Sequence, residues 1–150
     1  MINISKILIC TDGEEHTGKA EEYALTIAKK FNAEIVGLYV INPFLKKFTN
    51  EIYAINRDEC RDHLDRSLKN EGETALMNMS RKAETEGVTT YIKMRYGDPE
   101  EEILNEIRDV KYDIVVMGGK LLKGWKERFE SFNLSERVLK KSPLPVLIVR

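Results

Sequence analysis

Segments typical of buried strands alternate along this chain with segments of helical periodicity, and the strand-like segment occurs five times. The strand-like segments are Lys6–Thr11, Ala33–Ile41, Thr89–Arg95, Asp113–Met117 and Pro145–Val149. Between most of them, apolar residues recur at three- and four-residue spacing, as on one face of a helix. Connections of this length require parallel strands with right-handed crossovers. The sequence therefore predicts an α/β fold, in which a single open five-stranded parallel sheet has helices on both faces.

The helical segments have recognisable starts and ends. A first helix includes Ala20–Phe31, with Thr17 as its candidate cap. The spacing of the apolar residues Leu64, Leu68, Ala75, Met79 and Ala83 indicates a long charged helix that ends near Gly87. Asp98 has the character of a cap, and Pro99 suits the first helical position that follows it. The pattern between residues 44 and 57 is irregular, so no element is predicted there.

Strand order follows from how apolar the strands are. The first strand, the second and Asp113–Met117 are the most apolar, so we expect them at the centre of the sheet. The order 3-2-1-4-5 satisfies this and places the topological switch point between strands one and four. The loops after Thr11 and Met117 then face each other across one crevice, which is where open α/β sheets bind ligands.

Length and composition limit the number of domains and the classes of partner that this chain can have. The chain has 150 residues, which predicts one domain over 1–150, and its 25 acidic and 24 basic residues nearly cancel. No global field therefore favours nucleic acid or an anionic membrane. The two cysteines form no disulfide framework, and neither a signal peptide nor a membrane-spanning run is present. We expect a cytoplasmic protein without nucleic-acid or membrane partners.

Polar and glycine residues at the predicted switch point are the candidate ligand-binding residues. Asp12, which follows Thr11, could bond a ribose, a base or a metal–phosphate group, or it could simply turn the chain into the helix. Gly118 and Gly119 follow Met117, and glycines there let a phosphate approach backbone amides. Asn133 and Ser135 could cap the next helix and also meet phosphate oxygens. A tight turn followed by an ordinary cap explains the same residues.

Five motifs, in order and at consistent spacing, give the chain a family resemblance. They are the Asp12 turn, Tyr39-Val40-Ile41, Gly97-Asp98-Pro99, Asp113-Ile-Val-Val-Met-Gly118 and the ending from Ser135 to Val149. Together they resemble the universal stress protein family over nearly the whole chain. The resemblance implies the 3-2-1-4-5 sheet, a fold like that of the adenine nucleotide α-hydrolases, and a homodimer formed through the edge strand Val146–Val149.

The resemblance also implies a ligand. Many members bind ATP, with the aspartate after strand one and the end of strand two near the adenosine; here these are Asp12 and Val40. Their phosphates lie on a loop of the form Gly-x2-Gly-x9-Gly-Ser/Thr, which Gly118 would open. Other members lack that loop and do not bind ATP detectably.

The chain departs from that loop pattern. Leu121 stands at the second glycine position, Phe132 stands at the third, and the segment is one residue longer than the pattern. Side chains of this size would keep phosphate oxygens away from the backbone. The apolar residues of Leu121–Phe132 fall at helical spacing, which suits a cover over the crevice, a dimer contact or a protein partner. The lysines of the segment could still neutralise phosphates.

Two functional hypotheses remain. The first, which the missing glycines favour, is a stress-associated, non-catalytic binding or regulatory protein that needs no cofactor. The alternative is an adenine-nucleotide binder that takes ATP with Mg²⁺ and at most hydrolyses it slowly. No acid pair, serine elbow or placed nucleophilic cysteine indicates an enzyme. Cys60 and His63 lack the second ligand pair of a metal site, so we expect no metal site there.

Overall fold

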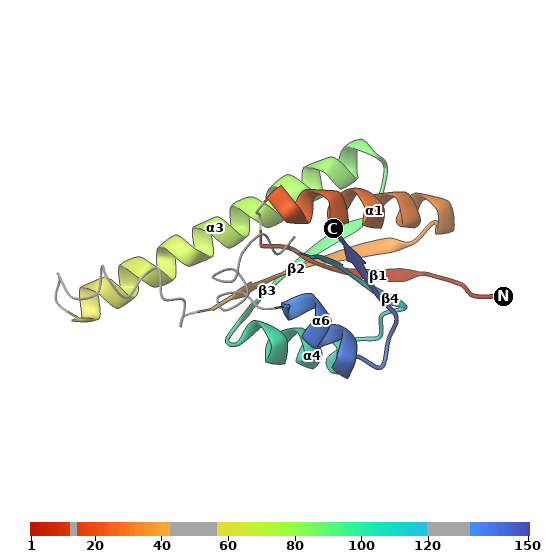
Figure 1. The fold of residues 1–150 in the computed structure, drawn as a ribbon. Coiled ribbons are helices and arrows are strands. Elements are labelled where there is room, and N and C mark those ends of the chain that lie inside the picture. The colour runs from red at the N-terminus through yellow and green to blue at the C-terminus, as the bar shows by residue number, and fades with distance from the viewer. Residues whose placement is uncertain (13–14, 43–56, 120–132) are drawn as a thin grey trace.

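The computed structural model describes residues 1–12, 15–42, 57–119 and 133–150, and Figure 1 shows its fold. The predicted segment Leu121–Phe132 lies outside these residues, as does nearly all of the irregular stretch before Arg57. The elements are β1 (Lys6–Cys10), α1 (Glu15–Phe31), β2 (Glu34–Ile41), α3 (Arg57–Thr85), β3 (Thr90–Tyr96), α4 (Pro99–Asp109), β4 (Ile114–Gly118), α6 (Leu134–Lys141) and β5 (Val146–Val149).

The described strands form one parallel sheet in the order β3-β2-β1-β4-β5, which confirms the predicted fold class and strand order. Helices α1 and α3 lie on one face of the sheet, and α4 and α6 lie on the other (Figure 1). The carboxyl ends of β1 and β4 therefore lie side by side, at the point where the strand order reverses.

The central strand β1 is buried on both faces. Ile7 and Ile9 belong to the core beneath α1 and α3, whereas Leu8 and Cys10 belong to the core beneath α4 and α6. Ile7, Leu8 and Ile9 have no exposed surface. Alternate residues of a strand point to opposite faces, so this uninterrupted apolar run requires a layer of helices on each side.

The structure corrects one of the predicted helix starts and confirms another. Helix α1 begins at Glu15, so Thr17 is not its cap but a buried residue within it. Helix α3 begins at Arg57, where the irregular stretch was predicted to end. Asp98 caps α4 as predicted, because its carboxylate accepts a hydrogen bond from the Glu101 amide at 3.0 Å.

A buried carboxylate ties α4 to the edge strand β3 and to the segment that leads into β4. Glu106 has no exposed surface. Lys93 donates to its Oε1 at 2.7 Å, Arg95 to its Oε2 at 2.7 Å, and the Tyr112 hydroxyl to its Oε1 at 2.6 Å. Burial raises the pKa of Glu106, but these three hydrogen bonds outweigh it, so the pKa lies below its ordinary value. Burial and the same carboxylate raise the pKa of Tyr112.

We expect Glu106→Gln to lower the free energy of unfolding at neutral pH by about 3 kcal/mol, because two cations and a phenol lose a buried anionic partner. The pKa of Glu106 falls on folding from an ordinary value of 4.5. Its stabilising effect is therefore complete above that pH and is lost as the pH falls through the lower, folded value. Urea unfolding measured across the acid range should show the difference between wild type and variant shrinking.

The matched control is Glu102→Gln, which removes a second and partly exposed acid from Arg95. This variant should lower the free energy of unfolding much less, because solvent screens that pair and Glu106 remains in place. Equal losses for the two variants would show that the buried carboxylate has no special role.

Candidate functional site

Six of the eight predicted site residues lie together at the carboxyl edge of the three central strands. Cys10 of β1 is level with Leu38 of β2 and with Met117 of β4. Thr11 extends this ladder, since its amide donates to the Leu38 carbonyl at 3.0 Å. The six residues are Thr11, Asp12, Val40, Met117, Gly118 and Gly119.

These residues differ in solvent exposure. Thr11 and Met117 are buried, Val40 and Gly118 are half-buried, and Asp12 is exposed. Asp12 is thus the predicted site carboxylate that a ligand in solution can reach. A carboxylate beside backbone amides can accept hydrogen bonds from hydroxyl or amino groups, which suits a polar ligand such as a nucleoside.

A buried polar network holds the end of β1 in place. The Thr11 hydroxyl donates to Oε1 of Glu21 at 3.1 Å and lies 3.3 Å from the Thr17 hydroxyl. The other oxygen of Glu21 accepts from Nζ of Lys82 in α3 at 2.8 Å. Because Thr11, Thr17 and Glu21 are all buried, the network fixes the strand end against α1 and α3.

Sequence reasoning missed Glu21 and Lys82. A signal for Glu21 was present: it lies beside Ala20 and Ala24, so its position falls on the apolar face of a helix. An acid on such a face requires a buried partner. The identity of that partner could not be predicted, because Lys82 is 61 residues away in the sequence.

Gly119 has a structural role that the sequence did not predict. The Gly119 amide donates to the Val149 carbonyl of β5 at 2.7 Å. A Cβ at Gly119 would lie 2.7 Å from Cγ2 of Ile148 and 3.2 Å from Cγ of Arg150. Glycine at this position therefore allows β5 to approach β4, and the Gly119 amide is already engaged within the sheet.

The other two predicted site residues lie at the start of α6. Asn133 takes the N-cap position in a left-handed conformation (φ 46°), and its side chain makes no capping hydrogen bond. Its predicted role as a side-chain cap is thus wrong, because this backbone conformation is not that of a capping residue. Ser135 is buried within the first turn. Arg150, after β5, reaches Glu136 in that turn at 3.4 Å, so the start of α6 lies at the same edge of the sheet.

Cys10 lies next to this edge but is chemically inert. It is a free, buried cysteine. Burial, followed by the negative charge of Glu106, raises the pKa of its thiol to about 12. A thiol of this kind remains protonated at neutral pH and is not a nucleophile.

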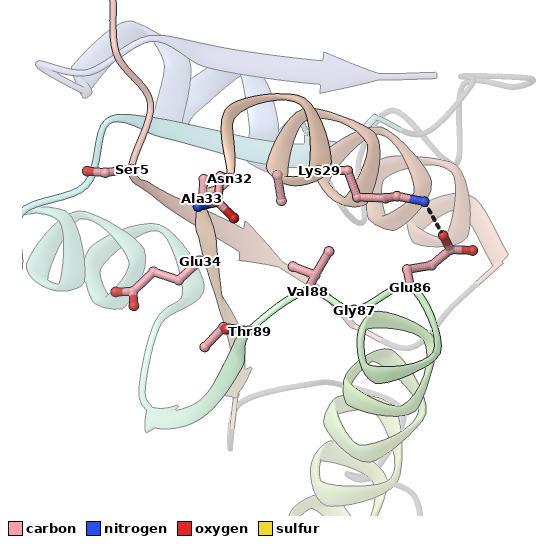
Figure 2. A pocket seen from close by; sticks show the side chains of 10 residues that line it. Ser5, Lys29, Asn32, Ala33, Glu34, Glu86, Gly87, Val88 and Thr89 are labelled. Carbon is pink, nitrogen blue, oxygen red and sulfur yellow. Dashed lines mark hydrogen bonds and ion pairs between the residues drawn. The ribbon is translucent and has the colours of Figure 1, made fainter.

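A hollow of about 440 Å³ lies at the opposite edge, where the strands begin (Figure 2). Buried Ala28, Ala33 and Val88 contribute to its lining. Lys29 at the end of α1 bonds Glu86 at the end of α3 at 2.6 Å beside it. Both side chains of this ion pair are about half exposed, so it contributes little stability. The hollow contains none of the predicted site residues.

The fold and the grouped residues define a class: an open α/β protein with a polar edge at its topological switch point. The universal stress protein family model matches residues 3–150. The chain belongs to this family, as its motifs predicted.

Two curated relatives are similar to this chain over almost its full length. Universal stress protein MJ0531 of Methanocaldococcus jannaschii is 33% identical over 147 residues, which cover 97% of this chain and 81% of the relative. Universal stress protein YxiE of Bacillus subtilis is 30% identical, with 97% of this chain and 99% of the relative covered.

Solved structures share the fold. That of the M. jannaschii protein MJ0577 superposes with a TM-score of 0.76 at 26% identity, covering 99% of this chain and 96% of that one. The structure of a universal stress protein in complex with cAMP superposes with a TM-score of 0.68 at 20% identity, covering 99% of this chain and 98% of that one. The structure of a family member from Arabidopsis thaliana with AMP bound superposes with a TM-score of 0.67 at 20% identity, covering 97% of this chain and 90% of that one.

None of the described helices combines the length and the apolar character needed to cross a bilayer.

We expect Gly119→Ala to destabilise the protein by about 1–3 kcal/mol, the usual effect of overpacking, because the branched side chain of Ile148 cannot move aside cheaply. Gly18→Ala is the matched control, since a Cβ there meets nothing within 4 Å. In the interior of α1 it should stabilise by about 0.5–1 kcal/mol. Thermal unfolding of both variants tests this. A neutral Gly119→Ala would leave phosphate binding as the better explanation for this glycine.

Proposed function

We propose that this protein is a stress-associated, non-catalytic binding protein of the cytoplasm, whose segment after β4 no longer holds a triphosphate. The observation that carries the proposal is the presence of Leu121 and Phe132 where the family's phosphate loop has glycines. The engaged amide of Gly119 supports it, since that donor is already used within the sheet. Such a protein needs neither a metal nor a cofactor to act.

We further propose that it works as a homodimer through β5, as a single domain over 1–150. The apolar residues of Leu121–Phe132 would supply a surface for a protein partner. Nucleic acid and membranes would not be partners, because the net charge is only −1.

A second candidate function is adenine-nucleotide binding at the carboxyl edge. Its support is the retained pair Asp12 and Val40, and the solved relatives described with AMP and cAMP. Each of these ligands carries a single phosphate. Loss of the glycine loop should weaken the binding of a triphosphate with Mg²⁺ more than that of a monophosphate. If the edge takes a nucleotide, we therefore expect AMP in preference to ATP.

Calorimetric titration of nucleotide-stripped protein with ATP–Mg²⁺, and separately with AMP, tests both functions. The primary proposal predicts no ATP binding below millimolar concentration. Micromolar ATP binding would overturn it and make side chains of residues 120–128 the phosphate ligands. If AMP binds, Asp12→Ala should weaken it about tenfold, the loss of one hydrogen bond to a charged group.

The control for Asp12→Ala is Glu84→Ala, which removes an exposed acid from α3. AMP affinity and melting temperature should stay unchanged in that variant. A large loss of stability in Asp12→Ala would instead assign Asp12 to the turn between β1 and α1.

A further inference from the structure

Helix α1 has two flanks with different surroundings. On one flank it faces α3, to which it is joined by the ion pairs Glu21–Lys82 at 2.8 Å and Lys29–Glu86 at 2.6 Å. Since α3 covers β2 and β3, the other flank of α1 points toward the β4–β5 side of the sheet (Figure 1).

That second flank carries an apolar stripe. Tyr23, Ile27 and Phe31 are spaced by four residues and so lie along one side of the helix. Tyr23 is 54% exposed and Phe31 is 44% exposed, while Ile27 is half-buried. Helix α1 contacts β5, and Ile27 and Leu147 of β5 pack against the same core cluster, so this flank lies on the β5 side of the sheet.

The two edge strands of the sheet differ in how readily they could pair with a strand of another chain. The edge strand β3 has exposed apolar residues, Tyr91 and Ile92, but it also carries Lys93 and Arg95, and charges on an edge discourage pairing with another strand. The edge strand β5 consists of the apolar residues Val146–Val149 and has β4 as its partner within the described residues. An uncharged edge beside an exposed apolar stripe is a surface suited to self-association.

The strand alone is too small for this purpose. Four residues span roughly 13 Å. A strand of that length cannot by itself bury the area of about 800 Å² per partner that a stable interface needs. Two β5 strands paired antiparallel about a two-fold axis perpendicular to the sheet would keep the same face of both sheets on the same side. Helix α1 of each copy would then flank the seam on that face.

We propose that Tyr23, Ile27 and Phe31 form the second part of a self-association surface, and that they pack against the same flank of a second copy of this chain. The inference rests on the proposed β5 homodimer and adds the helix layer to it. The net charge of −1 gives little repulsion between copies.

Sedimentation equilibrium of the full chain tests the inference with a flank variant, Tyr23→Lys with Phe31→Lys. Its dimer dissociation constant should be at least about tenfold above that of wild type, since central aromatic residues of an interface each contribute more than about 1 kcal/mol. The control is Tyr91→Lys with Ile92→Lys on β3, where the side chains are 55% and 49% exposed. The control should dimerise like wild type.

A cross-linking experiment keeps the inference testable if the flank variant does not fold. Tyr23→Cys in a Cys60→Ser background should form a covalent dimer with a short bismaleimide, whereas Tyr91→Cys should not. Cys10 will not compete, because it is buried.

The outcomes separate the two proposals. A dimeric wild type whose flank variant keeps the same dissociation constant would overturn the α1 contact and leave β5 pairing intact. A wild type that remains monomeric at high concentration would overturn both. Cross-linking through Tyr91 in place of Tyr23 would move the interface to the other edge of the sheet.

Discussion

The rest of the structure depends on the burial of β1 on both faces. Its alternate residues enter two separate cores, so helices must cover both sides and each connection must cross over the sheet. Parallel strands place all their carboxyl ends at one edge. The order β3-β2-β1-β4-β5 then brings the ends of β1 and β4 together, so that Asp12 follows β1 at the same edge as Gly118 at the end of β4. The candidate site is thus a product of the topology as much as of its residues.

Buried carboxylates connect the layers at two places. Glu106 joins β3 to α4, and Glu21 joins the end of β1 to α1 and α3. Each is satisfied by donors from other elements of the fold, as a buried charge requires. The first also pairs with Lys93 and Arg95, the charged residues of the edge strand β3. The other edge strand, β5, is uncharged over Val146–Val149.

The elements and strand order were predictable because apolar periodicity reports burial directly, as in Lys6–Thr11 and Asp113–Met117. The contacts of the site were not predictable in the same way. Thr17 reads as a cap in isolation, but the structure makes it part of a network with Thr11 and Glu21. Gly119 reads as a phosphate contact, but it also makes room for Ile148. These roles depend on how the elements pack against one another, which the periodicity of a single element does not contain.

The central claim is that side-chain bulk in the segment after β4 keeps the triphosphate away. The most direct measurement is ATP–Mg²⁺ affinity, by calorimetry, of a variant with glycine in place of both bulky residues, Leu121→Gly with Phe132→Gly. The account predicts a gain of at least about tenfold over wild type, equivalent to about 1.4 kcal/mol, with AMP affinity little changed. Unchanged ATP affinity in a variant that is folded would contradict it.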